Sequence, residues 1–406
     1  MDARTELLLT APPAPLLMKM ATPNALAFMI QSAVSMAEVW FIGRLGTGAL
    51  ASIALAFPLL MLTQTMSGGA TGGAVTSAIA RALGGADYVR AQRLIWHALA
   101  IAGAGAALFL IIYLMFGRAL LAFLGGSGDV LEQAADYCVV LFVGGVFVWL
   151  MGVVGAIFRG MGDMKLPAML MIVSALIQVP LSGVLVLGLF GAPELGIVGA
   201  AISAVVSSFL VSMAMLLVLS RPGRAIQLRV GDIRFSRELF GDILQVALPA
   251  SLSPLLTILI ILSLTAMVAT FGDAALAGYG IGSRVEFLLI PLVFGIGAAM
   301  TSLVGVSIGA GNIVRAEKIG WTGSSMAAGL AGVVGIVLAL ADHLVCLGDG
   351  IADAQPVHLI DRHRFLATHQ VVGEEDARPC VPGLRIRGQP DDILETAHGP
   401  SVTYYV

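Results

Sequence analysis

The sequence predicts an all-α, polytopic transmembrane helical bundle built from two related lobes, the second of them incomplete. Three observations predict this class. Of the 406 residues, 58% are hydrophobic and only 12% are charged, whereas an ordinary soluble domain carries about 25% charged residues. Nine apolar stretches precede Asp342, and each is long enough to cross a bilayer, which takes about 20 residues in a helix. A third signal is a long internal repeat.

The repeat joins an apolar, glycine-rich element to a basic loop, and both recur in the second half. The paired positions are Gly46 with Gly272, Gly84 with Gly309, and Arg90 with Arg315, at offsets of 226 falling to 225 residues. A period this long is typical of homologous halves of one membrane protein and not of a solenoid of short units. Six spans precede the second copy, and an even number returns the chain to its starting side. The two halves therefore share one orientation.

The nine predicted spans follow one another with short polar connections. Their approximate bounds are 15–42, 49–80, 94–116, 131–158, 166–190, 197–220, 243–271, 274–308 and 319–341. The predicted domains are a six-helix N-lobe over 1–220, an inter-lobe loop over 221–240, the first three helices of a C-lobe over 241–342, and a polar tail over 343–406. The oligomeric state is left open.

Basic residues in the short loops predict the orientation. Fourteen Lys and Arg residues lie on one side of the predicted membrane, against Arg44 and Arg118 on the other. Cytoplasmic loops carry such an excess, so we expect a multi-pass cell-membrane protein with a cytoplasmic N-terminus, in the inner membrane if the source is bacterial. The basic loop 221–240 also suits a lipid-headgroup or nucleic-acid patch, but the orientation rule accounts for it, and no nucleic-acid partner is expected.

The tail 343–406 differs abruptly from the rest of the chain. It holds five of the six histidines and nine of the 25 acidic residues, and no apolar run in it approaches a span. A frame disruption or misplaced gene end accounts for this better than an evolved domain, so we expect irregular coil and a chain that does not transport by itself. The competing idea, that the tail completes the C-lobe, is costly because unpaired ionised groups are unfavourable in lipid. Histidine spacing there predicts no metal site.

Glu38 is the first candidate for ion coupling, because it interrupts an otherwise apolar span. Burying a carboxylate there costs about 2.5 to 3.5 kcal/mol, and such residues persist mainly where they face a cavity and bind protons, cations or substrate. Apolar surroundings favour the protonated carboxyl form, so we expect Glu38 to exchange a proton near neutral pH. The alternative is that Glu38 reaches the outer interface near Arg44. Its repeat counterpart is Leu264, so the charge is not a repeated structural device.

A second pair of ionisable residues, Arg284 and Glu286, lies in the eighth span. Residues two apart on a helix point about 200° away from each other, so these two cannot pair directly. One interpretation is structural pairing with other helices. The other is a role in coupling or substrate binding, with Glu286 facing the interior of the C-lobe and Arg284 nearer the external water.

Four segments together resemble the multidrug and toxic compound extrusion (MATE) family. They read AEVWFIGRLGTGALASIALAFPLL, FRGMGDMKLP, VALPASLSPL and YGIGSRVEFLLIPLVFGIGAAMTSLVGVSIGAGN. The resemblance covers residues 15–341 and implies two six-helix lobes around a central cavity, so we expect this chain to be truncated or frame-disrupted in its second lobe. It also implies export of organic cations and other amphiphiles in exchange for protons or sodium ions.

The resemblance assigns roles residue by residue. Glu38 stands five residues before Gly43, at a position where many members carry an Asp in the first helix. Glu286 matches a Glu that is common in the branch with the pattern G-S-R-x-E, so these two are the candidate cation-coupling residues. The fifth-helix Asn and Asp of proton-coupled members fall on Gln178 and Ser182. The seventh-helix Glu of sodium-coupled members falls on Thr257. The candidates for lining or supporting the substrate cavity are Gln178, Ser182, Thr257 and Arg284.

The predicted function is secondary active multidrug efflux by alternating access, with protons favoured over sodium as the coupling ion. Small amphiphilic solutes and membrane lipid are the expected partners, and no cofactor or metal is expected. The alternatives are a lipid-linked oligosaccharide flippase of the same superfamily, an inactive fragment of a transporter and, less favoured, a membrane-embedded enzyme. The sequence contains no P-loop, G-x-S-x-G or H-E-x-x-H motif, which disfavours ATP-driven pumping and the corresponding enzymes.

Overall fold

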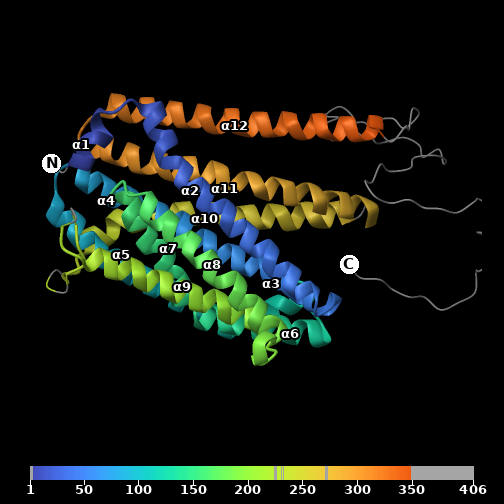
Figure 1. Ribbon diagram of the computed structural model, residues 1–406. Helices are drawn as coiled ribbons and strands as arrows, with labels where there is room; N and C mark the ends of the chain where they lie inside the picture. Colours follow the sequence, from blue (N-terminus) through green and yellow to red (C-terminus); the bar gives the residue numbers. More distant parts are fainter. Residues whose placement is uncertain (1–2, 224–225, 230, 232, 270–272, 349–406) are drawn as a thin grey trace, which may run out of the picture. The chain divides into compact units, whose positions relative to one another are not determined.

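A computed structural model describes residues 3–223, 226–229, 231, 233–269 and 273–348 of the chain. The side chains of residues 3, 262, 265–266, 269, 273–288, 291, 338–339 and 341–348 lie outside the described part. All regular elements in the described ranges are helices (Figure 1), which agrees with the predicted all-α class. The predicted tail is described only as far as Gly348, so the expectation of irregular coil falls on residues outside the description.

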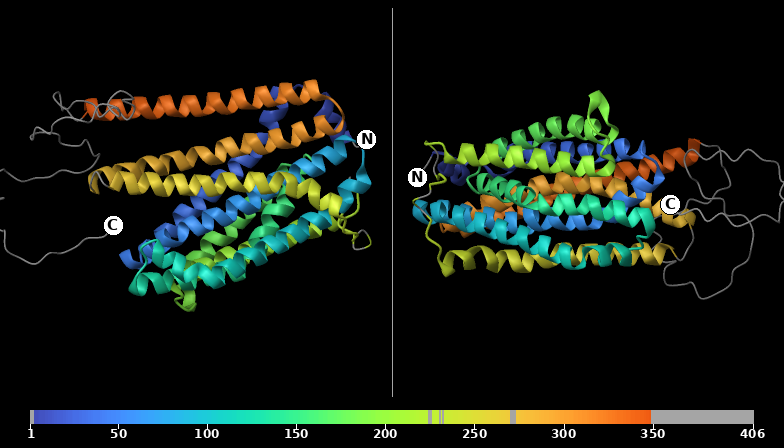
Figure 2. Two further views of the ribbon diagram at one scale, coloured as in Figure 1. Left: turned by 180° about the vertical axis from the view of Figure 1, so that it is seen from behind. Right: turned by 90° about the horizontal axis from the view of Figure 1, so that it is seen from below.

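The first half of the chain forms the elements expected of six spans. In order they are α1 (Ala3–Thr10), α2 (Pro13–Gly43), α3 (Thr47–Gln64), the π-helix η1 (Thr65–Thr71), α4 (Gly72–Gly84), α5 (Tyr88–Phe123), α6 (Gly128–Val143), α7 (Gly145–Gly160), α8 (Lys165–Leu187), the 3-10 turn η2 (Leu189–Gly191) and α9 (Gly196–Ser220). Helix α8 packs between α2 and α9, and α7 packs against α4, α5 and α9 (Figure 2).

Three long helices follow, α10 (Arg237–Ala269), α11 (Asp273–Gly309) and α12 (Ile313–Gly348). The chain divides into two compact units, Met1–Leu264 with Val285–Ala328, and Thr265–Arg284 with Gly329–Val406. The described part of the second unit consists of helical segments alone. Helix α12 runs beyond the domain boundary predicted at 342, because a helix can continue into water after its apolar stretch ends.

Eight described helices are long and apolar enough to cross a membrane, or nine if the bent pair α6 and α7 is one span. The sequence predicts a continuous helix over 131–158, whereas the structure bends there by 51°. The bend lies at Gly144 and Gly145, where Val205 of α9 approaches so closely that a Cβ on Gly144 would lie 2.4 Å from its methyl groups. Adjacent glycines are a usual site of kinks.

The predicted span 49–80 contains a π-helix in its middle. Residues Thr65–Thr71, with the sequence TMSGGAT, interrupt the regular α-helical hydrogen bonds between α3 and α4. Helix α7 packs closely against this π-helix at Gly68. A Cβ added to Gly152 of α7 would lie only 3.2 Å from the Gly68 backbone nitrogen. The glycines thus permit the close helix contact that small residues allow in membrane proteins.

The internal repeat is visible in the turns that precede α5 and α12. Ala86 and its counterpart Gly311 both have a left-handed backbone, with φ of 57° and 75°. One residue later, the side chains of Asp87 and Asn312 cap the next helix by accepting hydrogen bonds from the Arg90 and Arg315 backbone nitrogens at 2.9 and 3.0 Å. The two halves therefore repeat in local geometry as well as in sequence.

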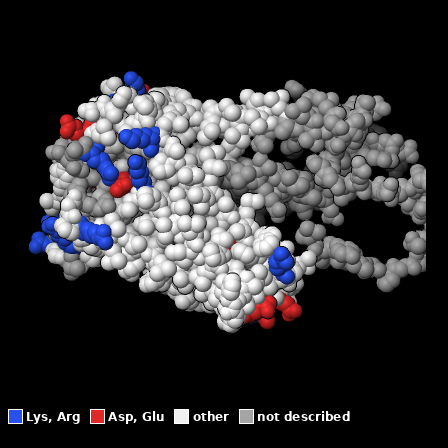
Figure 3. Space-filling model, in the orientation of Figure 1, with Lys and Arg blue, Asp and Glu red and all other residues white. Residues whose placement is uncertain are grey.

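Charged side chains lie mainly at the two ends of the helices. The face seen in Figure 3 has most of its Lys and Arg at one end, beside a few acidic side chains, and acidic side chains with a further basic one at the other end, with a wide and almost uncharged band between them. Such a band is what a bilayer requires of a helical bundle. We call the first end the arginine-rich end; it contains Arg81 and Arg90, which both contact Asp242, and Arg315, which binds the end of α1.

A close contact between α8 and α9 predicts a large effect of one methyl group. A Cβ on Gly199 would lie 2.7 Å from the carbonyl oxygen of Leu185, so Gly199→Ala should destabilise the bundle by about 1–3 kcal/mol through overpacking. Thermal unfolding in detergent measures this. Gly103→Ala is the matched control, because no atom lies within 4 Å of its Cβ position. Equal melting temperatures for the two variants would contradict the contact.

Candidate functional site

Glu38 ends a chain of hydrogen-bonded side chains that joins three helices, with Gln178 at its centre. The Gln178 side chain on α8 donates from Nε2 to Oε1 of Glu38 on α2 at 2.8 Å. The Ser207 hydroxyl on α9 donates to Oε1 of Gln178 at 3.1 Å. The amide of Gln178 therefore bridges a carboxyl group and a hydroxyl, and it fixes which way each of them points.

The helices place these groups together because α8 packs between α2 and α9. Gln178 and Ser207 are buried, and Glu38 is half-buried. On α2 the neighbouring Met36 and Trp40 are 69% and 57% exposed, so their apolar side chains occupy the outward face while Glu38 turns inward. Buried Tyr137 on α6 also lies near enough to interact electrostatically with Glu38.

Arg44 does not hold Glu38 at the end of the helix. The guanidinium of Arg44 lies over the Trp40 ring, 4.8 Å from its centroid, while Glu38 bonds to Gln178. The alternative in which Glu38 reaches the interface beside Arg44 is therefore not the arrangement in this structure. A carboxyl group directed into the helix bundle is available to bind a proton or a small cation there.

Ser182 occupies the same face of α8 as Gln178, one turn further on. Its side chain is 0% exposed, and its hydroxyl has no hydrogen-bond partner among the described residues. An unsatisfied buried hydroxyl costs about 1–3 kcal/mol. The structure thus brings Gln178 and Ser182 to one helix face but joins only Gln178 to Glu38.

The remaining predicted site residues lie elsewhere or outside the described side chains. Thr257 on α10 is exposed, and its hydroxyl donates to the Ser253 carbonyl of its own helix at 2.9 Å, so it does not join Glu38. Arg284 and Glu286 are in α11, but their side chains fall outside the description. Among the described residues, no group of three or more His, Cys, Asp or Glu is placed to hold a metal ion.

Two residues at or near the site were not among the predicted ones: Ser207, which is hydrogen-bonded to Gln178, and Tyr137, which interacts electrostatically with Glu38. A signal for Ser207 exists in the sequence, because Ser203, Ser207 and Ser208 recur near helical spacing within an apolar span and all are buried. Polar hydroxyls at that spacing indicate a face turned to a neighbouring helix. Tyr137 has no comparable signal, since an aromatic residue in an apolar helix is ordinary.

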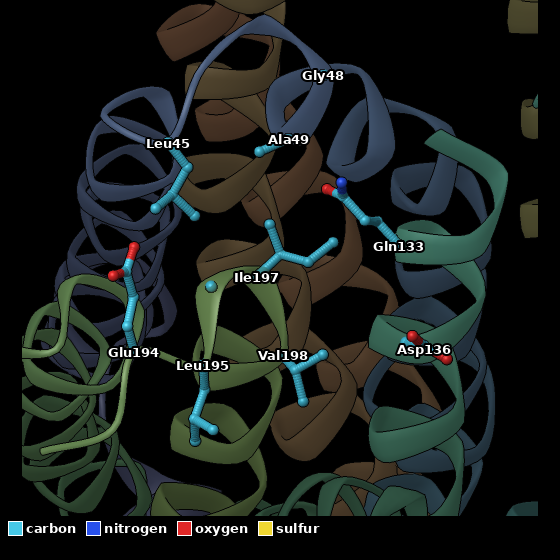
Figure 4. Close-up of a pocket in the computed structure, with 10 residues that line it drawn as sticks. Leu45, Gly48, Ala49, Gln133, Asp136, Glu194, Leu195, Ile197 and Val198 are labelled. Atoms are coloured by element: carbon cyan, nitrogen blue, oxygen red, sulfur yellow. The ribbon is translucent and has the colours of Figure 1, made fainter. Parts of the chain in front are cut away.

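An open hollow of about 480 Å³ lies between the first turn of α3, α6 and the beginning of α9, opposite the arginine-rich end. Figure 4 shows Gln133 and Asp136 on one wall and Glu194 on the other, with Ile197 and Val198 between them. The two carboxylates give this end of the bundle a negative potential, which raises the local concentration of cations.

Comparisons with known proteins identify the fold and family. The MatE family model matches residues 23–184 and 249–353. A protein named FAD transporter from Shewanella oneidensis is 30% identical over 77% of this chain and 69% of its own length. The probable multidrug resistance protein YoeA of Bacillus subtilis is 27% identical over 80% of this chain and 70% of its own.

A solved structure has the same fold. It is described as an outward-facing conformation of a multidrug resistance MATE family transporter of the MOP superfamily. The TM-score is 0.77 at 25% identity, and the match covers 86% of this chain and 76% of that one.

The bond between Glu38 and Gln178 predicts a coupling in stability. Replacing either residue by Leu should lower the free energy of unfolding of the bundle. The loss in the double variant should be smaller than the sum of the two single losses by about 0.5–3 kcal/mol, because the first substitution has already broken the bond. Thermal or denaturant unfolding in detergent gives the three values. Asn24→Leu is the control, since Asn24 is also buried in α2 but donates to Met164; its effect should add to that of Glu38→Leu.

Proposed function

The chain belongs to the MatE family of membrane transporters, and from this premise we propose that it exports amphiphilic solutes, above all organic cations, in exchange for protons. In this proposal it acts as a secondary antiporter and the exchange follows alternating access, in which the two lobes open in turn to either side. We propose further that the arginine-rich end faces the cytoplasm of the cell membrane, because loops on that side carry most of the Lys and Arg.

The observation that carries the proposal is the position of Glu38. Its carboxyl is half-buried inside the bundle and oriented by an amide, not paired with Arg44 at the surface. An ionised carboxylate in that place attracts a cationic solute, whereas a protonated one is neutral and stable in apolar surroundings. Binding of a proton and binding of a cation then exclude each other, which is the condition for exchange.

The hollow at the opposite end fits this arrangement. With the arginine-rich end in the cytoplasm, Asp136 and Glu194 line a hollow that opens toward the outside. Their charge attracts protons and cations from the external solution. Tyr137 follows Asp136 on α6 and is close enough to interact electrostatically with Glu38, so the helix that lines the hollow also passes near the proposed coupling site.

A flavin dinucleotide is a second candidate substrate. The relative from Shewanella oneidensis that is 30% identical to this chain is named an FAD transporter. Such a solute is amphiphilic but carries phosphates. It would be bound through cations and not through Glu38, so it is tested beside the organic cations.

The transport assay uses inverted membrane vesicles with an imposed proton gradient and measures uptake of ethidium and of FAD. One arm contains the 406-residue chain, which the repeat argument predicts to be inactive alone. The other contains residues 1–341 followed by the last three spans of the Shewanella relative. Gradient-driven ethidium uptake by the second arm supports the proposal. Uptake of FAD without uptake of ethidium would make the flavin dinucleotide, and not an organic cation, the substrate. Absence of uptake of both solutes would refute multidrug and flavin export.

Replacing Glu38 by Gln tests the coupling role within the active arm. Glu38→Gln keeps a hydrogen-bonding group beside Gln178, so insertion and melting temperature should change little. Proton-driven uptake should fall at least about tenfold, because the site can no longer exchange a proton. Glu132→Gln is the control, since that carboxylate is exposed and pairs with Arg118 at 3.3 Å. Unchanged pH-dependent uptake in Glu38→Gln would remove Glu38 from the mechanism.

Glu286 has two proposed roles that one variant separates. If it takes part in coupling, Glu286→Gln should insert normally and transport poorly. If it only pairs with another helix, removal of its charge should first lower the amount of protein in the membrane and its thermal stability. Quantitative immunoblotting of membranes beside the uptake assay decides between the two.

A further inference from the structure

Two arginines at repeat-related positions bind across the junction of the two halves. Arg90 follows α4 in the first copy, and its guanidinium contacts the second half: Nε lies 3.0 Å from Oδ2 of Asp242, and Nη1 lies 3.2 Å from Oε1 of Glu238. Both acidic residues belong to the first turns of α10. The first copy thereby holds the beginning of the second.

Arg315 makes the reciprocal contact. It stands 225 residues after Arg90, and its Nη2 donates to the carbonyl oxygens of Leu8 and Ala11 at 2.9 and 2.6 Å. These carbonyls end α1, where a helix terminus favours a cation. Helix α1 is itself attached to the first half, since Arg4 pairs with Asp163 at 3.2 Å and Leu8 is buried against Gly162. The second copy thereby holds the beginning of the first.

Between the two arginines, α4 and α11 touch backbone to backbone. A Cβ on Gly84 would lie 2.1 Å from the Val306 carbonyl oxygen, and a Cβ on Gly309 would lie 2.0 Å from that of Arg81. These contacts exchange under the 225-residue offset, because Gly84 corresponds to Gly309 and Arg81 to Val306. The two halves therefore meet about a local two-fold axis at the arginine-rich end, and only glycine permits this approach.

We propose that Arg90 and Arg315 are the two latches of a gate at the arginine-rich end, and that both must release before the cavity opens on that side. The inference rests on the proposed alternating access. The glycine contact offers few polar groups that water could replace. The carboxylates bound to Arg90 and the helix-end carbonyls bound to Arg315 can instead be hydrated when the halves separate. The pair at Arg90 is partly exposed, with side-chain exposures of 37% and 25% for Arg90 and Asp242, so water already reaches it.

Opening of the gate is measurable at Ser302, without substrate or gradient. Ser302 lies one turn before Gly305 on the face of α11 that contacts α4, is 0% exposed, and has no hydrogen-bond partner among the described residues. Ser302→Cys is nearly isosteric and loses no bond. In a chain whose native cysteines are replaced by Ala, the rate at which a small maleimide labels this thiol reports the fraction of open gate.

The latch variants are Arg90→Ala, Asp242→Asn and Arg315→Ala in the full 406-residue chain. Each should raise the labelling rate about fivefold, which corresponds to about 1 kcal/mol. Exchange of charges in Arg90→Asp with Asp242→Arg should restore slow labelling. Arg118→Ala is the matched control, because it breaks an exposed ion pair with Glu132 at the opposite end and should leave labelling unchanged.

Local unfolding is separated from gating by a second reporter. Cys138 is a free, fully buried thiol in α6, so the same arginine variants are labelled in a chain that keeps Cys138 as its only cysteine. Fast labelling at Ser302→Cys with an unreactive Cys138 supports the latches. Equal acceleration at both thiols, an unchanged rate at Ser302→Cys, or failure of the charge exchange would overturn the proposal. Because no transport is measured, these outcomes are independent of the antiport test.

Discussion

The low polarity of the bilayer is the constraint on which this structure depends. Within the hydrocarbon every backbone N–H and C=O needs a partner in the protein, so the spans are helices and the irregular stretches lie at their ends. The same constraint acts on side chains. Glu38 is tolerated inside the bundle because Gln178 donates to it and Ser207 in turn donates to Gln178. The side chain of Gln178 thereby connects α2, α8 and α9, so the bonds that hold an intramembrane carboxyl group also orient three helices.

Glycine provides the other half of the architecture. In a membrane no hydrophobic effect drives helices together, and close backbone approach replaces it. The contact of α4 with α11 at Gly84 and Gly309 is of this kind, as is the approach of Gly152 to the π-helical stretch near Gly68. A single added methyl group abolishes a contact of this kind, and no side chains interlock to oppose its separation. Such contacts would suit the relative movement of the two halves that the proposed alternating access requires.

The repeat links these features. Duplication of one half would place a capped turn, a left-handed residue and an arginine at equivalent positions, and Asp87 and Asn312 show that the turns are built alike. Their arginines nevertheless bind different partners, carboxylates on α10 for Arg90 and helix-end carbonyls of α1 for Arg315. The same local unit has thus been kept while its contacts diverged. Glu38 has diverged further, because its counterpart is Leu264.

The sequence by itself determined the helical class, the apolar spans, the repeat and the choice of Glu38 as an intramembrane charge, because each is a matter of composition or spacing along one chain. Only the tertiary structure decided what Glu38 touches. Gln178 is 140 residues away, and no local pattern determines which faces of α2 and α8 meet. The bend at Gly144 depended likewise on Val205 of another helix, and the latch contacts of Arg90 and Arg315 depended on how the two halves pack. Spacing predicts which face of a helix is apolar, whereas the identity of its neighbour depends on side-chain shapes from the whole bundle.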